Sequence, residues 1–226
     1  MTSTSTGKRV IFEPRRDQPA PGVTRGGGRR NDSKCWQDRQ SSQAPAHTQS
    51  LGQLLTPLLR SPLDEPQLTV LTHPTFLVYI PQTSAKTVAF ALEDADGNGI
   101  YQTAMNLTGT PGIISISLPT TVPELEIGKD YKWIVSVVCQ TGAPEDWFAE
   151  GSVRRIHADS SLSQVEQVEP LEQITLYAKS GIWFETVANL AVLRKAQPNN
   201  PEITAAWEEL LDDAGLGAIA NAPLQH

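Results

Sequence analysis

The stretch EDADGNG at residues 93–99 places oxygen-bearing side chains at the spacing of a calcium-binding loop. Asp94, Asp96 and Asn98 would supply the first ligands, and the glycine after them the sharp turn. The twelfth position needs a bidentate glutamate, but it holds Met105, whose thioether is a poor ligand for a hard cation. Asp-Gly and Asn-Gly between alternating apolar runs are also the strongest short signal for a β-hairpin. We therefore expect a hairpin and no metal site, with weak calcium binding at its turn as the alternative.

The histidines are the side chains best suited to general base catalysis near neutral pH, and they are scattered: His47, His73, His157 and His226. None stands beside a nucleophile in a known catalytic motif. The chain has no G-x-S-x-G, P-loop or H-E-x-x-H motif. His73 precedes a proline, and we interpret it as a residue at the entry to a strand. The sequence therefore predicts no catalytic residue, no metal ligand and no cofactor.

Acidic side chains are adjacent at three places: Glu145–Asp146, Glu208–Glu209 and Asp212–Asp213. These pairs fall in an expected loop or on the polar face of an expected helix, where charged side chains are ordinarily solvated. No motif marks any of them as the carboxyl pair of a glycosidase. We therefore expect a protein that is not an enzyme, with a carbohydrate-active enzyme of unfamiliar type as the alternative.

The chain has two cysteines, Cys35 and Cys139, and neither belongs to a C-x-x-C pair, so zinc is not expected. In an oxidising compartment they could form a disulfide that ties the N-terminal arm to the body of the protein. A closed loop of about 100 residues would then stabilise the fold by up to about 4.7 kcal/mol in the chain-entropy account. In a reducing compartment Cys139 would be a core thiol and Cys35 would be free.

The elements that would position these residues begin with short strands. Gly, Pro, Asn and Asp clusters separate segments that alternate apolar and polar side chains: 75–81, 86–94, 100–107, 112–119, 131–139 and 146–156. This pattern predicts an antiparallel β-sandwich of the immunoglobulin or fibronectin type III kind over residues 51–158. Tyr131 opens a strand three residues after Gly128, which resembles a tyrosine corner, in which the hydroxyl bonds to upstream backbone. An ordinary strand tyrosine is the alternative.

After residue 159 the apolar period becomes that of helices. We expect one helix to start at Pro170, a second over residues 182–197, and a third from Pro201 to about residue 214. Tyr177, Ala188 and Pro198 echo a tetratricopeptide hairpin. The predicted fold class is therefore α+β, with a small helical segment over residues 159–226 packed on the sandwich.

Residues 1–50 are poor in apolar side chains, apart from a short stretch at Val10–Phe12, and we expect a disordered arm. Residues 1–49 carry nine Lys and Arg against four Asp and Glu, whereas the remainder carries nine against twenty-one. The acidic body would repel phosphate backbones, so nucleic acid is not an expected ligand. The basic arm could make a weak contact with an anionic surface. The chain has no apolar run long enough for a membrane span, and its first residues lack the apolar core of a signal peptide.

Several strings together carry a family resemblance: HPTFLVYIP, GTPGIISISLP, LEIGKDYKWIVSVVC and LYAKSGIW. The chain resembles a bacterial family that is found mostly in cyanobacteria and is known only as domain of unknown function 928. The resemblance implies no assigned activity and offers no catalytic residues. Members commonly begin with a secretion signal, so the resemblance implies a periplasmic or extracellular protein, whereas the first residues, read literally, imply a cytoplasmic one. Both cysteines match the family by position, which favours the Cys35–Cys139 disulfide.

We therefore expect a non-enzymatic interaction module of the cell envelope that binds a protein or glycan partner. Besides the carbohydrate-active enzyme, a cytoplasmic adaptor that uses its C-terminal helices as a groove is an alternative.

Overall fold

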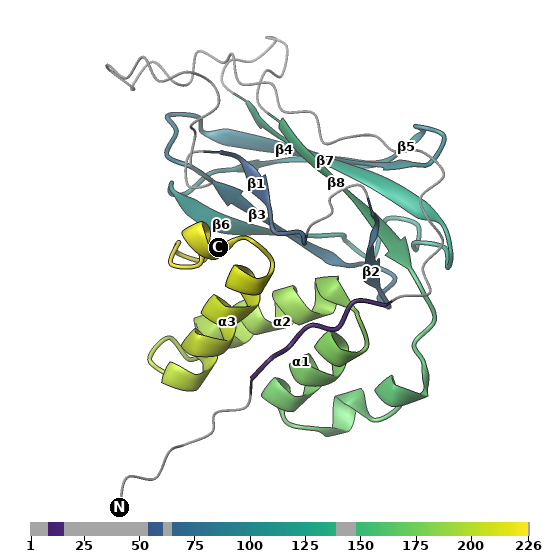
Figure 1. The fold of residues 1–226 in the computed structure, drawn as a ribbon. Helices are drawn as coiled ribbons and strands as arrows, with labels where there is room; N and C mark the ends of the chain where they lie inside the picture. Colours follow the sequence, from purple (N-terminus) through teal and green to yellow (C-terminus); the bar gives the residue numbers. More distant parts are fainter. Residues whose placement is uncertain (1–8, 16–53, 61–64, 139–147, 226) are drawn as a thin grey trace, which may run out of the picture.

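The computed structural model describes residues 9–15, 54–60, 65–138 and 148–225, and Figure 1 shows their arrangement. The strands in these ranges are β1 (Thr56–Pro57), β2 (Gln67–Thr69), β3 (Thr75–Ile80), β4 (Thr87–Asp94), β5 (Gly99–Asn106), β6 (Gly112–Ser117), β7 (Asp130–Val138) and β8 (Phe148–Arg155). The α-helices are α1 (Pro170–Lys179), α2 (Trp183–Ala196) and α3 (Pro201–Asp213).

The strands form two sheets. One has five strands in the order β2-β8-β7-β4-β5, and the other has three in the order β1-β3-β6. All pairings between these strands are antiparallel except that of β2 with β8. The six strands predicted from the alternating pattern are confirmed, with ends that differ by one or two residues. The chain therefore has an α+β fold, in which two mostly antiparallel sheets precede a helical part.

Alternate residues of the central strands fill the space between the sheets. Phe90 on β4 pairs with Val135 on β7, and both side chains are at most 1% exposed. The ring of Phe76 on β3 lies 5.1 Å from the rings of both Phe90 and Trp133, measured between centroids. Gly151 on β8 stands opposite Trp133, and a Cβ there would come within 2.9 Å of the indole. The period-two pattern thus forms a close-packed aromatic core.

Tyr131 fixes the chain where it enters β7. Its hydroxyl accepts a hydrogen bond from the backbone N–H of Glu126 at 2.9 Å, and its side chain is 4% exposed. Gly128, between them, has a φ of +79°, which a residue with a side chain rarely adopts. The bond expected between Tyr131 and upstream backbone is therefore confirmed, whereas kinship with immunoglobulin or fibronectin type III sandwiches stays a prediction.

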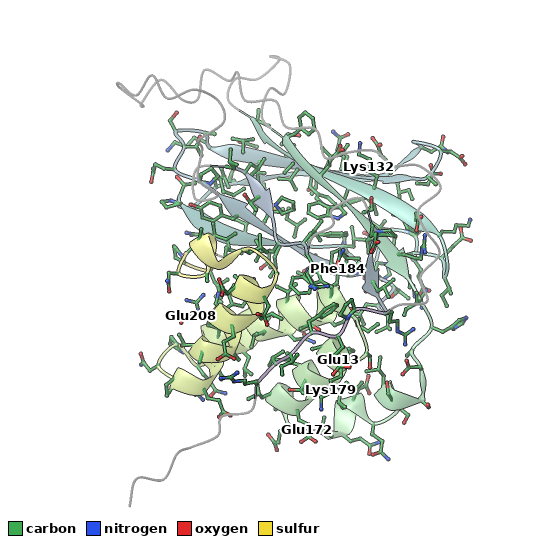
Figure 2. The ribbon with its side chains drawn as sticks, in the orientation of Figure 1. Glu13, Lys132, Glu172, Lys179, Phe184 and Glu208 are labelled. Atoms are coloured by element: carbon green, nitrogen blue, oxygen red, sulfur yellow. The ribbon has the colours of Figure 1, made fainter. Side chains whose placement is uncertain are left out.

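The three helices lie together below the two sheets in the view of Figure 1. As predicted, prolines stand at the starts of α1 and α3. The first turn of α2 is buried on all sides, and Phe184 lies at the junction of helices and sheets (Figure 2) with its ring 5.3 Å from that of Phe76. One hydrophobic cluster runs through the sheets and all three helices. No helix in the described ranges is long and apolar enough to cross a bilayer.

Residues 9–15 differ from the disordered course expected for the arm. They cross the surface of the helices (Figure 1), and the Glu13 N–H donates to the carbonyl of Ala178 at 2.9 Å. Val10 is 2% exposed, and the Phe12 ring packs edge-on against Trp183 at a centroid distance of 5.2 Å. The short apolar stretch at Val10–Phe12 therefore docks on the helices. The other residues of the arm lie outside the described ranges, and the domain boundaries at residues 50 and 158 stay predictions.

Candidate functional site

Asp94 and the residues after it form the turn between β4 and β5. One carboxylate oxygen of Asp94 accepts from the backbone N–H groups of Asp96 (3.0 Å) and Asn98 (2.8 Å), and the other accepts from the Asn98 side-chain amide (2.9 Å). The Asn98 side chain is the main cause that holds the pKa of Asp94 below its usual value. The predicted hairpin is therefore confirmed. The Asp94 carboxylate accepts hydrogen bonds from its own turn and so stabilises it.

His73 is held by both ring nitrogens. Nδ1 lies 2.9 Å from the hydroxyl of Thr72, and Nε2 lies 2.9 Å from the carbonyl oxygen of Val122. These contacts fix the chain just before β3, as expected for a residue at the entry to a strand. His157 is exposed after β8.

The paired acids that the structure describes are on α3. Glu209, Asp212 and Asp213 are exposed there, and Glu208 is half-buried. Within the described residues, no three His, Cys, Asp or Glu side chains are grouped so as to hold a metal ion. The remaining predicted positions lie outside the described ranges: Cys35, Cys139, His47, His226 and the pair Glu145–Asp146. The disulfide between Cys35 and Cys139 therefore stays a prediction.

Glu185, in the first turn of α2, is a buried acid that the sequence did not mark. Its side chain is 2% exposed. One oxygen, Oε1, accepts from the Thr69 hydroxyl at 2.5 Å and from the N–H groups of Val70 and Leu71 at 3.1 Å each. The other oxygen, Oε2, is buried and has no hydrogen-bond partner among the described residues. The carboxyl thus fastens α2 to the end of β2.

Burial sets the protonation of this carboxyl. Loss of solvation raises the pKa of Glu185, and the hydrogen bonds from Thr69, Val70 and Leu71 oppose that rise only in part. The pKa of Tyr177 on α1 is also raised, first by burial and then by the nearby Glu185. A perturbed acid often marks a catalytic site. Because Oε1 of Glu185 is bonded to Thr69, Val70 and Leu71, the contacts shown for this carboxyl are structural ones between α2 and the end of β2.

Three of the four sheet edges are either very short or partly covered by another part of the chain. The β1 edge is two buried residues long and ends in Pro57, which has no N–H to offer. The C-terminal residues cover the start of the β6 edge, because the Ile113 N–H donates to the Pro223 carbonyl at 2.8 Å and the Ile113 carbonyl accepts from the Gln225 N–H at 2.7 Å. The β2 edge is three residues long and continues into the backbone that Glu185 binds.

The fourth edge, β5, is longer than β1 and β2, and no segment within the described ranges covers it. It has eight residues, and nothing else in the described part of the chain pairs with it besides β4. A register irregularity at Leu92/Glu93 affects only its start, so residues 101–106 pair regularly with β4. The strand carries no charge and no proline, the features that usually block an exposed edge.

The register shows which backbone groups of β5 face outward. The Leu107 N–H donates to the Lys86 carbonyl at 2.8 Å, so this pair is hydrogen-bonded. Directly hydrogen-bonded pairs alternate with unbonded ones along an antiparallel ladder. The N–H and C=O groups of Gln102, Ala104 and Asn106 therefore point away from β4, and their side chains are exposed. We call these three residues the open edge.

The open edge was missed at the sequence level although its strand was found. Alternation predicts a strand but not its neighbours in the sheet, so the edge position of β5 could not be read from the pattern. The signal that was present is the lack of charge: residues 99–123 contain no Asp, Glu, Lys or Arg and belong to the longest uncharged run in the chain, residues 97–123.

Comparison with known proteins adds a family and no activity. A protein-family model described as Domain of Unknown Function (DUF928) matches residues 25–224, which include both sheets and all three helices. A comparison with curated proteins gives no match.

Proposed function

Because the chain belongs to the DUF928 family, whose description names no activity, we propose from the geometry that it is a non-enzymatic interaction module of the cell envelope. In this proposal a protein partner binds at the open edge of β5 by adding a strand to the five-stranded sheet. Main-chain hydrogen bonds supply the attraction in this mode of recognition, and alternate side chains supply the selectivity.

The observation that carries the proposal is the contrast between β5 and the other three edges. An uncovered strand edge is a ready template for pairing, and folded proteins ordinarily block it with charge, proline, a bulge or a cover. In this chain β1 and β2 offer edges of only two and three residues, and the C-terminal residues cover the start of β6. Residues 101–106 of β5 form a longer edge that is regular and uncharged. An edge left in this state fits a partner strand.

The placement of the polar groups supports a binding role. Glu185, His73 and Asp94 each hold neighbouring backbone in place, and the acids that a carbohydrate-active enzyme would use on α3 are mostly exposed. For the envelope location, the support is the secretion signal common in the family that the chain resembles, together with the two cysteines. The Tyr131 hydroxyl bond supports kinship with immunoglobulin-like sandwiches, which serve widely as extracellular binding modules.

The experiment compares capture from envelope fractions of the native host by three versions of the protein. Ala104→Lys places a charge in the open edge, whereas Ala205→Lys makes the same change at an exposed position of α3. We expect wild type and Ala205→Lys to retain the same binding protein and Ala104→Lys to lose it. Equal capture by all three would contradict binding at β5, and native protein found only in the cytoplasm would contradict the envelope location.

A further inference from the structure

We infer that the strand which binds the open edge is β5 of a second copy of this chain, so that two five-stranded sheets join about a two-fold axis. This inference rests on the proposed function, because it names the partner of the same edge.

The first argument is charge. The whole chain has a formal net charge of −7, so two copies repel each other except where charge is absent. The open edge lies in the uncharged run of residues 99–123. The adjacent strand β4 carries charge only at its end, at Glu93 and Asp94 beside the turn. Farther into the sheet, Lys132 Nζ lies 2.6 Å from Glu150 and Arg154 Nε lies 2.5 Å from Asp130. Because Gln102, Ala104 and Asn106 carry no charge, an uncharged strand such as β5 of a second copy would meet no charge repulsion along the open edge.

The second argument is register. In an antiparallel pair of identical strands, the outward-facing residues must pair with one another, and each such pair exchanges two N–H···O bonds. An axis at Ala104 satisfies this condition, because Ala104 then faces Ala104 of the other copy and Gln102 faces Asn106. The methyl side chain of Ala104 lets identical residues meet on the axis without a clash. The regular part of β5 is centred close to this residue.

The third argument is the inner face of the strand. Tyr101, Met105 and Leu107 are apolar, only partly buried, and packed against the main hydrophobic cluster. The same register places Tyr101 of one copy beside Leu107 of the other, and Thr103 beside Met105. Pairing therefore extends the apolar core across the axis and further buries side chains that are only partly buried in the single chain.

The first test is mass against concentration, by sedimentation of the full chain between about 1 and 300 μM. Pairing through one strand is a small interface, so we expect a dissociation constant in about the micromolar range. Ala104→Lys should weaken association on the order of tenfold or more, because two ammonium groups then meet on the axis. Ala205→Lys adds the same charge on α3 and should associate like wild type. Wild type that stays monomeric over the whole range would overturn the inference.

The second test checks the register with two double variants. Gln102→Lys with Asn106→Glu places opposite charges face to face at both ends of the pairing, and we expect association within about threefold of wild type or tighter. Gln102→Lys with Asn106→Lys places like charges there and should weaken association on the order of tenfold or more. Equal dissociation constants for the two double variants would contradict a two-fold axis at Ala104. Circular dichroism melting should show that both variants are folded.

The two proposals can fail separately. A monomeric wild type that nevertheless captures an envelope protein, and loses it in Ala104→Lys, would refute the second copy and leave strand addition at β5 intact. A monomeric wild type with no capture that depends on Ala104 would refute both.

Discussion

The two ends of the five-stranded sheet are built in opposite ways. At the β2 end, the backbone after the strand is bound by Glu185, the helices cover the sheet, and residues 9–15 lie across the helices. At the β5 end, Gln102, Ala104 and Asn106 leave their outward backbone groups without a partner in the described chain. At the β2 end, contacts join segments that are far apart in the sequence. We therefore expect these contacts to contribute most to the free energy of unfolding. The β5 end makes fewer contacts with distant segments, and under the proposed function it is the binding edge.

We call the β2 end of the sheet, with the helices and residues 9–15, the closed end. We expect the largest loss of stability from replacing a buried aromatic side chain there. Trp183 is fully buried, and its Nε1–H donates to the Leu58 carbonyl at 2.8 Å. We expect Trp183→Ala to lower the free energy of unfolding by about 3–5 kcal/mol, measured by urea denaturation. Val192→Ala is the matched control, because Val192 is on the same helix and 68% exposed, and it should cost less than about 0.5 kcal/mol. Similar losses for the two variants would contradict a closed end that holds the fold.

The next largest effect is the pH dependence that Glu185 gives to this end. Burial raises the pKa of Glu185 above its ordinary 4.5, so the folded state holds the proton more tightly than the unfolded state. Its stabilising contribution is complete below pH 4.5 and is lost as the pH rises through the raised pKa. In that window the free energy of unfolding falls by up to about 1.4 kcal/mol per pH unit.

Denaturation series at pH values from 4.5 to 8 would isolate this contribution. Glu185→Gln cannot ionise, so we expect its free energy of unfolding to lack the decline that Glu185 causes in wild type. Glu169→Gln, at an exposed position before α1, should keep the wild-type profile. A Glu185→Gln profile parallel to that of wild type would show that this carboxyl stays in one protonation state across the range.

The difference between the β5 end and the β2 end of the sheet also explains which elements could be predicted from the sequence. β4, β5 and the turn at Asp94 are neighbours along the chain, so alternation and turn residues predicted them. The helices were equally readable, because Pro170 and Pro201 mark their starts. Local structure follows from local pattern, and these elements carry strong patterns.

The closed end was largely missed because its contacts join residues far apart in the sequence. Thr69 and Glu185 are separated by more than a hundred positions, and β1 and β2 are too short to show a period. Glu185 stands in the first turn of a helix, where an acid is ordinary. Residues 9–15 show only one weak sign, the apolar stretch Val10–Phe12, which the polar composition around it outweighed. Without knowledge of which distant segments meet, such residues cannot be told from solvated ones.

Residues 9–15 offer a smaller test of the closed end. Phe12 packs against Trp183, and the Arg60 guanidinium lies 4.6 Å from the centre of the Phe12 ring. Because Phe12 is only partly buried, we expect Phe12→Ala to cost about 1–2 kcal/mol, less than a fully buried aromatic. Ile11→Ala is the control, since Ile11 is 54% exposed and should change stability little. Equal effects at the two positions would show that the segment does not dock as described.

The smallest stability effect, and the sharpest test of the contrast, comes from removing the C-terminal residues that cover the start of β6. Removal of residues 223–226 takes away the two hydrogen bonds with Ile113 and should cost about 1 kcal/mol in the free energy of unfolding. It also leaves β6 uncovered, in the same uncharged run as β5. If an uncovered, uncharged edge is sufficient for pairing, the shortened chain has two such edges and should form species larger than a dimer. The same deletion in Ala104→Lys should still associate, now through β6 alone. A shortened chain with wild-type association would mean that an open edge alone is not sufficient, and that the side chains of β5 select its partner.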